Sequence, residues 1–307
     1  VAGSHVAIAT GTASGKSLAY TMPIVAAVMK DEGSALSDPC ALYLAPTKAL
    51  ANDQARSWRD LALPGIREAV VDGDSNADER AWARRHANVV LTNPDMLHYS
   101  LLPGHERWSR LLRNLRYIVV DEAHAYRGVF GAHVSLVLRR LRRLAEHHRS
   151  SPVVIAASAT SGAPERSVAR LIGAPVTAIT EDSSPTPERT VVLWQSPTDD
   201  GGSSATRDAA ALTSAAVREG CQVLTFLRSR RAVEYVASLV REQHADHASI
   251  PSGSDTIAAY RGGFLAEERR ALEDGLRSGI IRALATTNAL ELGIDIAGMD
   301  VVVTAGW

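Results

Sequence analysis

The residues with the clearest chemical purpose form a short loop near the N-terminus. Residues 9–17 read ATGTASGKS, directly after an apolar run that predicts a strand and at the start of a helical pattern. Small residues here let backbone N–H groups close around phosphates at a helix N-terminus. Lys16 is predicted to reach the β- and γ-phosphates, and Ser17 to ligate a magnesium ion. We expect the nucleotide contacts to come from Gly11, Thr12, Ala13, Ser14, Gly15, Lys16 and Ser17.

A pair of consecutive carboxylates strengthens the prediction of a nucleotide site. Alone, the loop could be an ordinary strand-to-helix turn, because Thr10 stands where the strict phosphate-loop pattern has a glycine. Residues 116–124, however, read RYIVVDEAH, an apolar strand pattern that ends in Asp121 and Glu122. At the carboxyl end of a strand in the same sheet, Asp121 can hold magnesium and Glu122 can polarise the attacking water. Together, the loop and the acidic pair predict nucleotide hydrolysis.

The elements that would position these residues alternate in type along the first half of the chain. Near-continuously apolar runs alternate with helical patterns, which is typical of a parallel sheet covered on both faces. The predicted strands are residues 5–9, 41–45, 68–71, 88–92, 116–120 and 153–157, and the predicted helices are 16–29, 49–61, 77–86 and 132–148. These elements predict a doubly wound parallel-sheet α/β domain over residues 1–182.

The composition changes over residues 183–205. This segment is rich in Ser, Pro, Asp and Gly, which is typical of a linker, apart from one predicted short strand at 190–193. The elements that follow are helices 206–218, 230–243 and 266–277, a polar loop at 244–254, and strands 221–226, 256–259, 281–285 and 301–304. We therefore predict a second α/β domain over residues 206–307, with both domains incomplete at the ends of the chain.

The bulk composition is that of a soluble globular protein. Of the 307 residues, 46% are hydrophobic and 22% charged, and no apolar run approaches the roughly 18 residues that a membrane span needs. No secretory leader is apparent, and Cys40 and Cys221 suit neither a disulfide framework nor a zinc site. We therefore expect a cytoplasmic protein. The net charge of -1 indicates that any nucleic-acid site is a local groove rather than a broad basic surface.

The order of the motifs resembles that of superfamily 2 helicases of the DEAH-box kind. Residues 158–160 read SAT, and four further stretches are similar to motifs Ia, Ib, IV and V of that family: APTKALANDQ at 45–54, TNPDMLH at 92–98, LTFLRSRRAVE at 224–234 and ATTNALELGID at 285–295. The combination is most similar to the RecQ-four-like, mitomycin repair factor A branch of DNA-repair helicases, whose core usually precedes a zinc-binding domain. The resemblance covers nearly the whole chain and implies two RecA-like domains of the P-loop NTPase class.

The resemblance also implies roles for individual residues. His124 would join the catalytic group, and Ser158 and Thr160 would couple the state of the nucleotide to domain movement. Gly293 and Asp295 would approach the nucleotide. Six residues would contact the backbone of the nucleic acid: Thr47, Lys48, Thr92, Asn93, Arg228 and Thr287. Thr47 and Thr92 would do so through hydroxyl and N–H groups.

The function that follows is that of an ATP-dependent helicase, which uses ATP and Mg²⁺ to move 3′ to 5′ on single-stranded DNA. Duplex DNA and RNA stay open as partners, and two alternatives are an RNA-remodelling ATPase and a nucleic-acid-binding module without activity. Glu122 argues against the latter, because a pure binding module needs no carboxylate to polarise water. A third alternative, a restriction-type translocase subunit, would need partner or nuclease segments that this sequence does not contain. Since no arginine finger follows motif V, and such a residue is worth roughly a thousandfold in rate, we expect this piece of chain to hydrolyse ATP poorly.

Three other groups of residues are interpreted structurally. A basic run on the predicted helix 132–148 is expected to be a solvated face opposite an apolar stripe. Tryptophans are expected to pack in the core rather than to stack on bases, and we assign no metal to the histidines. These groups are Arg139, Arg140, Arg142 and Arg143; Trp58, Trp82 and Trp108; and His133, His147 and His148.

Overall fold

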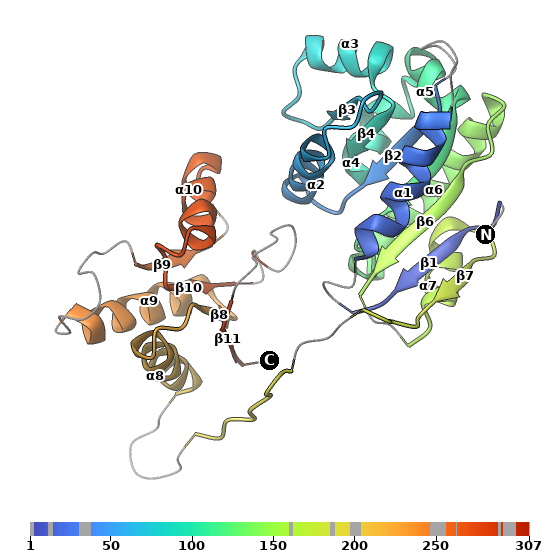
Figure 1. The fold of residues 1–307 in the computed structure, drawn as a ribbon. Helices are drawn as coiled ribbons and strands as arrows, with labels where there is room; N and C mark the ends of the chain where they lie inside the picture. The colour runs from blue at the N-terminus through green and yellow to red at the C-terminus, as the bar shows by residue number, and fades with distance from the viewer. Residues whose placement is uncertain are drawn as a thin grey trace. The chain divides into compact units, whose positions relative to one another are not determined.

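The chain divides into two α/β units, Val1–Glu188 and Arg189–Trp307, both drawn in Figure 1. The computed structural model describes residues 3–11, 15–30, 38–159, 162–184, 188–196, 204–245, 256–261, 263–287, 290 and 299–306. Six of the predicted site residues therefore lie outside the described residues: Thr12, Ala13, Ser14, Thr160, Gly293 and Asp295. Each unit is treated separately below.

The first unit is built on a seven-stranded sheet in the order β3-β4-β2-β5-β6-β1-β7, with parallel pairing throughout. Its strands are β1 (Val6–Ala9), β2 (Cys40–Leu44), β3 (Glu68–Val70), β4 (Val89–Thr92), β5 (Leu115–Val120), β6 (Val153–Ser158) and β7 (Thr177–Ile179). Strands β1 and β5 flank β6. Because the strands are parallel, the loop after β1 and the acidic pair after β5 lie at the same edge of the sheet.

Helices cover both faces of this sheet, as Figure 1 shows. The helical segments are α1 (Lys16–Lys30), α2 (Lys48–Asp60), α3 (Ala77–His86), α4 (Pro94–Met96), η1 (Leu97–Leu101), η2 (His105–Trp108), α5 (Ser109–Arg113), η3 (Ala123–Ala125), α6 (Gly128–His147) and α7 (Pro164–Ile172). Successive strand residues point to opposite faces. Tyr43 and Leu91 accordingly pack with α1 and α2, whereas Leu42 and Val90 pack with α5, α6 and α7.

The second unit has a four-stranded parallel sheet in the order β11-β8-β10-β9. Its elements are α8 (Ala205–Arg218), β8 (Val223–Leu227), α9 (Arg230–Ala245), β9 (Ile257–Tyr260), α10 (Ala266–Arg277), β10 (Ala283–Thr286) and β11 (Val301–Ala305). One face packs against α8 and α9, and the other against α10. The predicted α/β class is confirmed in both units.

One predicted strand is wrong. Thr190–Leu193 is extended but pairs with no strand among the described residues, and the side chains of Val191, Val192 and Leu193 are exposed, the last to 94%. β-Branched residues favour a strand only where a neighbouring strand supplies the hydrogen bonds. Strand β7, helix α7 and the short helical segments between Pro94 and Arg113 were not predicted, because they are too short for a clear periodic pattern.

The arginine-rich face of α6 is partly structural. Arg139 and Arg142 donate to the carbonyl oxygens of Arg170 (2.9 Å) and Ile172 (3.0 Å) at the end of α7. The expected apolar stripe on α6 is buried at Val134, Leu138 and Leu141. Of the three tryptophans, Trp58 and Trp108 are buried as predicted, whereas Trp82 is 45% exposed. None of the described helices is both long and apolar enough to cross a membrane.

Candidate nucleotide and nucleic-acid sites

The phosphate loop joins β1 to α1. The ammonium of Lys16 donates to the carbonyl oxygens of Thr10 (3.1 Å) and Gly11 (2.6 Å), which follow β1. Gly15 has a φ of +74°, a conformation that side chains rarely adopt. The residues at both ends of the loop therefore have the backbone and the cation that a phosphate-binding loop requires.

A carboxylate that the sequence did not single out holds the start of this loop. Asp182, which follows β7, accepts a hydrogen bond of 2.9 Å from the Gly11 N–H. Hydrogen bonds from Ser184 lower the pKa of Asp182, so this carboxylate is ionised at neutral pH. A Cβ atom at Gly11 would lie 3.0 Å from the same oxygen, so this position favours glycine. Only the parallel pairing of β7 with β1 brings Asp182 here, and the sequence did not predict β7.

The acidic pair begins directly after β5, a central strand. Asp121 is buried, and its two carboxylate oxygens accept hydrogen bonds from the Tyr43 hydroxyl and, at 2.9 Å, from the Glu122 N–H. Burial raises the pKa of Asp121, and the hydrogen bonds from Tyr43 and Glu122, followed by the charges of Lys16 and His124, oppose that shift. Lys16 and Asp121 are thus close enough to interact electrostatically.

Two tyrosines connect the acidic pair to the phosphate loop. The rings of Tyr20 in α1 and Tyr43 in β2 meet edge to face with centroids 5.7 Å apart. The Tyr20 hydroxyl donates to Gln54 of α2 at 3.1 Å, and Ser17 at the start of α1 lies close enough to oppose the rise of the Tyr20 pKa by burial. Ser17 and Asp121 thus approach the same pair of tyrosines, and their oxygen atoms are the donor type that magnesium prefers. Neither tyrosine was predicted, because each lies within an otherwise apolar pattern.

Glu122 and His124 link the acidic pair to the end of β6. Glu122 has a left-handed backbone conformation (φ 46°, ψ 46°), and its Oε2 lies 3.1 Å from Nδ1 of His124. The same nitrogen lies 3.2 Å from the backbone N of Ala159, next to the buried Ser158. Without a proton on Nδ1 the ring can accept from Ala159, whereas with a proton on Nδ1 it can donate to Glu122. The structure therefore brings Glu122 and His124 into contact and places His124 against Ala159, the residue that follows Ser158.

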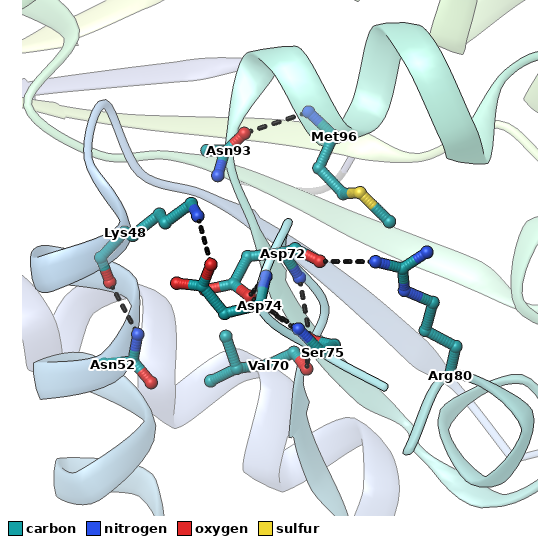
Figure 2. A network of polar contacts seen from close by, with 9 residues as sticks. All are labelled: Lys48, Asn52, Val70, Asp72, Asp74, Ser75, Arg80, Asn93 and Met96. Atoms are coloured by element: carbon teal, nitrogen blue, oxygen red, sulfur yellow. Dashed lines mark hydrogen bonds and ion pairs between the residues drawn. The ribbon is translucent and has the colours of Figure 1, made fainter. Parts of the chain in front are cut away.

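The nucleic-acid candidates of the first unit follow β2 and β4, which are adjacent strands. Thr47 is the N-cap of α2, where its hydroxyl oxygen accepts from the Leu50 N–H at 3.2 Å and leaves its own proton free to donate. Lys48 is exposed and forms an ion pair with Asp74 (2.8 Å), shown in Figure 2. Asn93 is buried and caps the next short helix by accepting from the Met96 N–H at 2.9 Å.

Thr92 requires a correction. Its side chain is fully buried, and its hydroxyl donates to the carbonyl oxygen of Val71 at 2.7 Å. The expected hydroxyl contact of Thr92 with nucleic acid is therefore wrong for this structure, because the hydroxyl forms a hydrogen bond that joins β4 to the end of β3. Thr92 instead fixes the loop that carries Asp74.

The candidates of the second unit also follow neighbouring strands. Arg228 comes directly after β8 and is exposed, with its side chain beside Gly306, where an added Cβ would lie 3.2 Å from Nε. Thr287 comes directly after β10 and is half-buried. Because β8 and β10 are paired in parallel, both residues lie at the carboxyl edge of this sheet.

Comparison with protein families matches two profiles in the predicted order. The profile described as DEAD/DEAH box helicase covers residues 1–168, and the one described as helicase conserved C-terminal domain covers residues 208–306. The first match alone spans more than half of the chain.

Similar proteins and solved structures point to one branch of this family. The uncharacterized ATP-dependent helicase YprA of Bacillus subtilis is 38% identical over 99% of this chain, and the ATP-dependent helicase hrq1 of Schizosaccharomyces pombe is 37% identical over 99%. A crystal structure of the DUF1998 helicase MrfA bound to DNA matches 99% of the chain at 38% identity with a TM-score of 0.90. The predicted branch is thereby confirmed. The chain spans only 40%, 29% and 40% of these three proteins, respectively.

Proposed function

This chain belongs to the DEAD/DEAH box helicase family, and we propose that it is the nucleotide-driven motor core of a DNA helicase. One observation carries the proposal. Lys16, after β1, and Asp121, after β5, lie at the same edge of one parallel sheet and interact electrostatically. A cation for the phosphates and a carboxylate for their metal are the parts that phosphoryl transfer to water requires.

In this proposal the site binds ATP together with Mg²⁺. Lys16 contacts the phosphates, while the hydroxyl of Ser17 and the carboxylate of Asp121 hold the metal ion, which neutralises phosphate charge when bound. Glu122 accepts a proton from the attacking water. The unpredicted tyrosines support the fit, because Tyr43 donates a hydrogen bond to Asp121 and Tyr20 lies close to both Tyr43 and Ser17.

We assign a coupling role to the contacts between Glu122, His124 and the end of β6. His124 reaches Glu122 Oε2 at 3.1 Å and the Ala159 N–H at 3.2 Å through the same ring nitrogen. A change at Glu122 during hydrolysis therefore alters the hydrogen bond to the segment that contains Ser158. Thr160, which lies outside the described residues, is assigned to the same step on the family resemblance alone.

DNA is the proposed track. MrfA has been solved bound to DNA, and the helicase Lhr of Mycobacterium smegmatis, 28% identical to this chain, has been solved bound to single-stranded DNA. We propose that Thr47, Lys48 and Asn93, with Arg228 and Thr287 of the second unit, contact the strand. Contacts of this kind reach the sugar–phosphate backbone, so little sequence specificity is expected. Movement from 3′ to 5′ and a cytoplasmic location complete the proposal.

Nucleotide binding by this chain tests the proposal directly. We expect a fluorescent ATP analogue with Mg²⁺ to bind, and Lys16→Ala to weaken binding at least about tenfold, since Lys16 is the cation of the loop and charge-assisted contacts are the strong ones. Lys30→Ala, at the other end of α1, is the matched control and should bind as the unchanged chain does. Equal affinities for all three proteins would contradict the proposed nucleotide site.

A further inference from the structure

Lys48, the exposed cation among the proposed nucleic-acid contacts of the first unit, forms an ion pair with Asp74. Nζ of Lys48 lies 2.8 Å from Oδ1 of Asp74, with the Lys48 side chain 46% exposed and that of Asp74 80% exposed. Figure 2 shows the two side chains meeting between the start of α2 and the loop that follows β3. The hydrogen bond that Lys48 donates to Asp74 raises the pKa of Lys48, so the lysine stays charged.

The loop that carries Asp74 is held by an unusual density of hydrogen bonds. Asp72 is buried, and its Oδ1 accepts from the backbone N–H groups of Asp74 (2.8 Å) and Ser75 (3.1 Å). Its carbonyl oxygen accepts from Arg80 at 3.1 Å, and the Ser75 hydroxyl donates to the Val70 carbonyl oxygen at 3.2 Å. The backbone at Asp74 is thus fixed, while its carboxylate is exposed to solvent.

The partner is equally well placed. Lys48 is the first residue of α2, where the partial positive charge of the helix disfavours a cation, and the first turn of α2 contains no acidic residue. Gly73 lies against the Lys48 side chain, and a Cβ atom there would come within 3.1 Å of Nζ. The carboxylate that neutralises Lys48 therefore comes from another element, the loop after β3, in which Gly73 lies against the lysine side chain.

We infer that Asp74 is an internal competitor for Lys48, which a nucleic-acid phosphate must displace in order to bind. The inference rests on the proposed function, because it assigns a second residue to the nucleic-acid surface proposed there. A carboxylate and a phosphate oxygen are alternative partners for the same ammonium. Asp74 thereby sets how tightly a strand binds and how that binding responds to salt.

Such a competitor favours a chain of phosphates over a single one. An exposed ion pair is worth only a factor of roughly 1.4 to 5 in an equilibrium, so it is easily exchanged. The tethered carboxylate nevertheless has a high local concentration beside Lys48, as any partner on the same chain does. A nucleic-acid strand that is bound at neighbouring residues also has a high local concentration of phosphate beside Lys48, whereas free inorganic phosphate does not.

Asp74→Asn tests the inference, with binding measured by fluorescence anisotropy of a labelled single-stranded oligothymidylate at several NaCl concentrations. We expect roughly two- to fivefold tighter binding at low salt. The gain should shrink as the salt concentration rises, because salt also weakens the exposed ion pair between Lys48 and Asp74 in the unchanged chain.

Two controls separate this effect from a change in net charge. Asp60→Asn, at the opposite end of α2 and on the order of 18 Å away along the helix, makes the same change in charge and should leave affinity unchanged. In a Lys48→Gln background, Asp74→Asn should no longer tighten binding. Unchanged or weaker binding by Asp74→Asn, or equal tightening by Asp60→Asn, overturns the competitor role while the proposed function stands. If the unchanged chain binds no oligonucleotide at all, the proposed function fails and the competitor role fails with it.

Discussion

Burial opposes the ionisation of Asp121, and the Tyr43 hydroxyl offsets part of that effect. Asp121 has to be a carboxylate to hold a metal ion, yet its side chain is 8% exposed, and removal from water raises its pKa. Tyr43 donates to one oxygen and the Glu122 N–H to the other. Tyr43 therefore keeps the carboxylate ionised, and burial in turn raises the pKa of Tyr43, so that its proton remains available to donate.

The substitution Tyr43→Phe should expose this dependence. It leaves one oxygen of a buried carboxylate without its donor, which costs about 1.5–3 kcal/mol of unfolding free energy at neutral pH. A hydrogen bond that favours the carboxylate lowers the pKa of Asp121, so its contribution exists only while Asp121 is ionised. The deficit should therefore shrink as the pH falls through the pKa of Asp121 in the folded chain.

Urea unfolding of Tyr43→Phe at neutral and acid pH measures this effect. Tyr117→Phe is the matched control. Tyr117 lies in β5 and, within the described part of the chain, makes no side-chain hydrogen bond to the acidic pair, so this substitution should cost little stability at either pH. A deficit that stays constant across the pH range would show that Tyr43 acts through packing alone.

At the scale of elements, the sequence predicted most long helices and strands and missed the short ones. The alternation of apolar strands and helical patterns identified six strands of the first sheet and the order of the site motifs. Strand β7 has only three residues, Thr177–Ile179, and so escaped detection, and with it Asp182 as the partner of Gly11. The opposite error occurred at Thr190–Leu193, where a strand was predicted but none forms, because strand propensity cannot show whether a pairing partner exists.

The candidate site was predictable where a residue type reveals its chemistry and unpredictable where contacts decide. The phosphate loop and the acidic pair are recognisable from type and spacing. Tyr43 resembles any other apolar strand residue until the pairing of β2 with β5 brings it to Asp121. Thr92 carries a hydroxyl suited to phosphate, yet only the structure shows that this hydroxyl is buried against Val71.

The junction of α6 and α7 offers a prediction at the same scale. Gly173 ends α7 with a φ of +71°, and a Cβ atom there would lie 2.8 Å from Nε of Arg139. Gly173→Ala should lower the free energy of unfolding by roughly 1–2 kcal/mol, because alanine is strained in a left-handed conformation. Gly162→Ala meets no atom within 4 Å and should be close to neutral. Chemical denaturation compares the two, and equal stability would argue against strain at Gly173.

The whole molecule repeats one arrangement in two units. In each, the candidate residues follow the carboxyl ends of parallel strands: Lys16 and Asp121 in the first unit, and Arg228 and Thr287 in the second. This is the edge at which open α/β sheets bind ligands. The chain nevertheless spans only 40% of YprA and 29% of hrq1, so motor activity is best measured on the full-length protein.

The most direct test of the motor assignment is the rate of ATP hydrolysis by the full-length protein, measured with and without single-stranded DNA. The unchanged protein is compared with the Glu122→Gln variant. The glutamine keeps the shape of the side chain but cannot accept a proton from water. We predict a rate that rises with DNA and falls at least about a hundredfold in Glu122→Gln, while the variant still binds ATP. A rate of hydrolysis that does not change with DNA, or that is the same in Glu122→Gln, would contradict the assignment of this chain as a DNA-dependent motor.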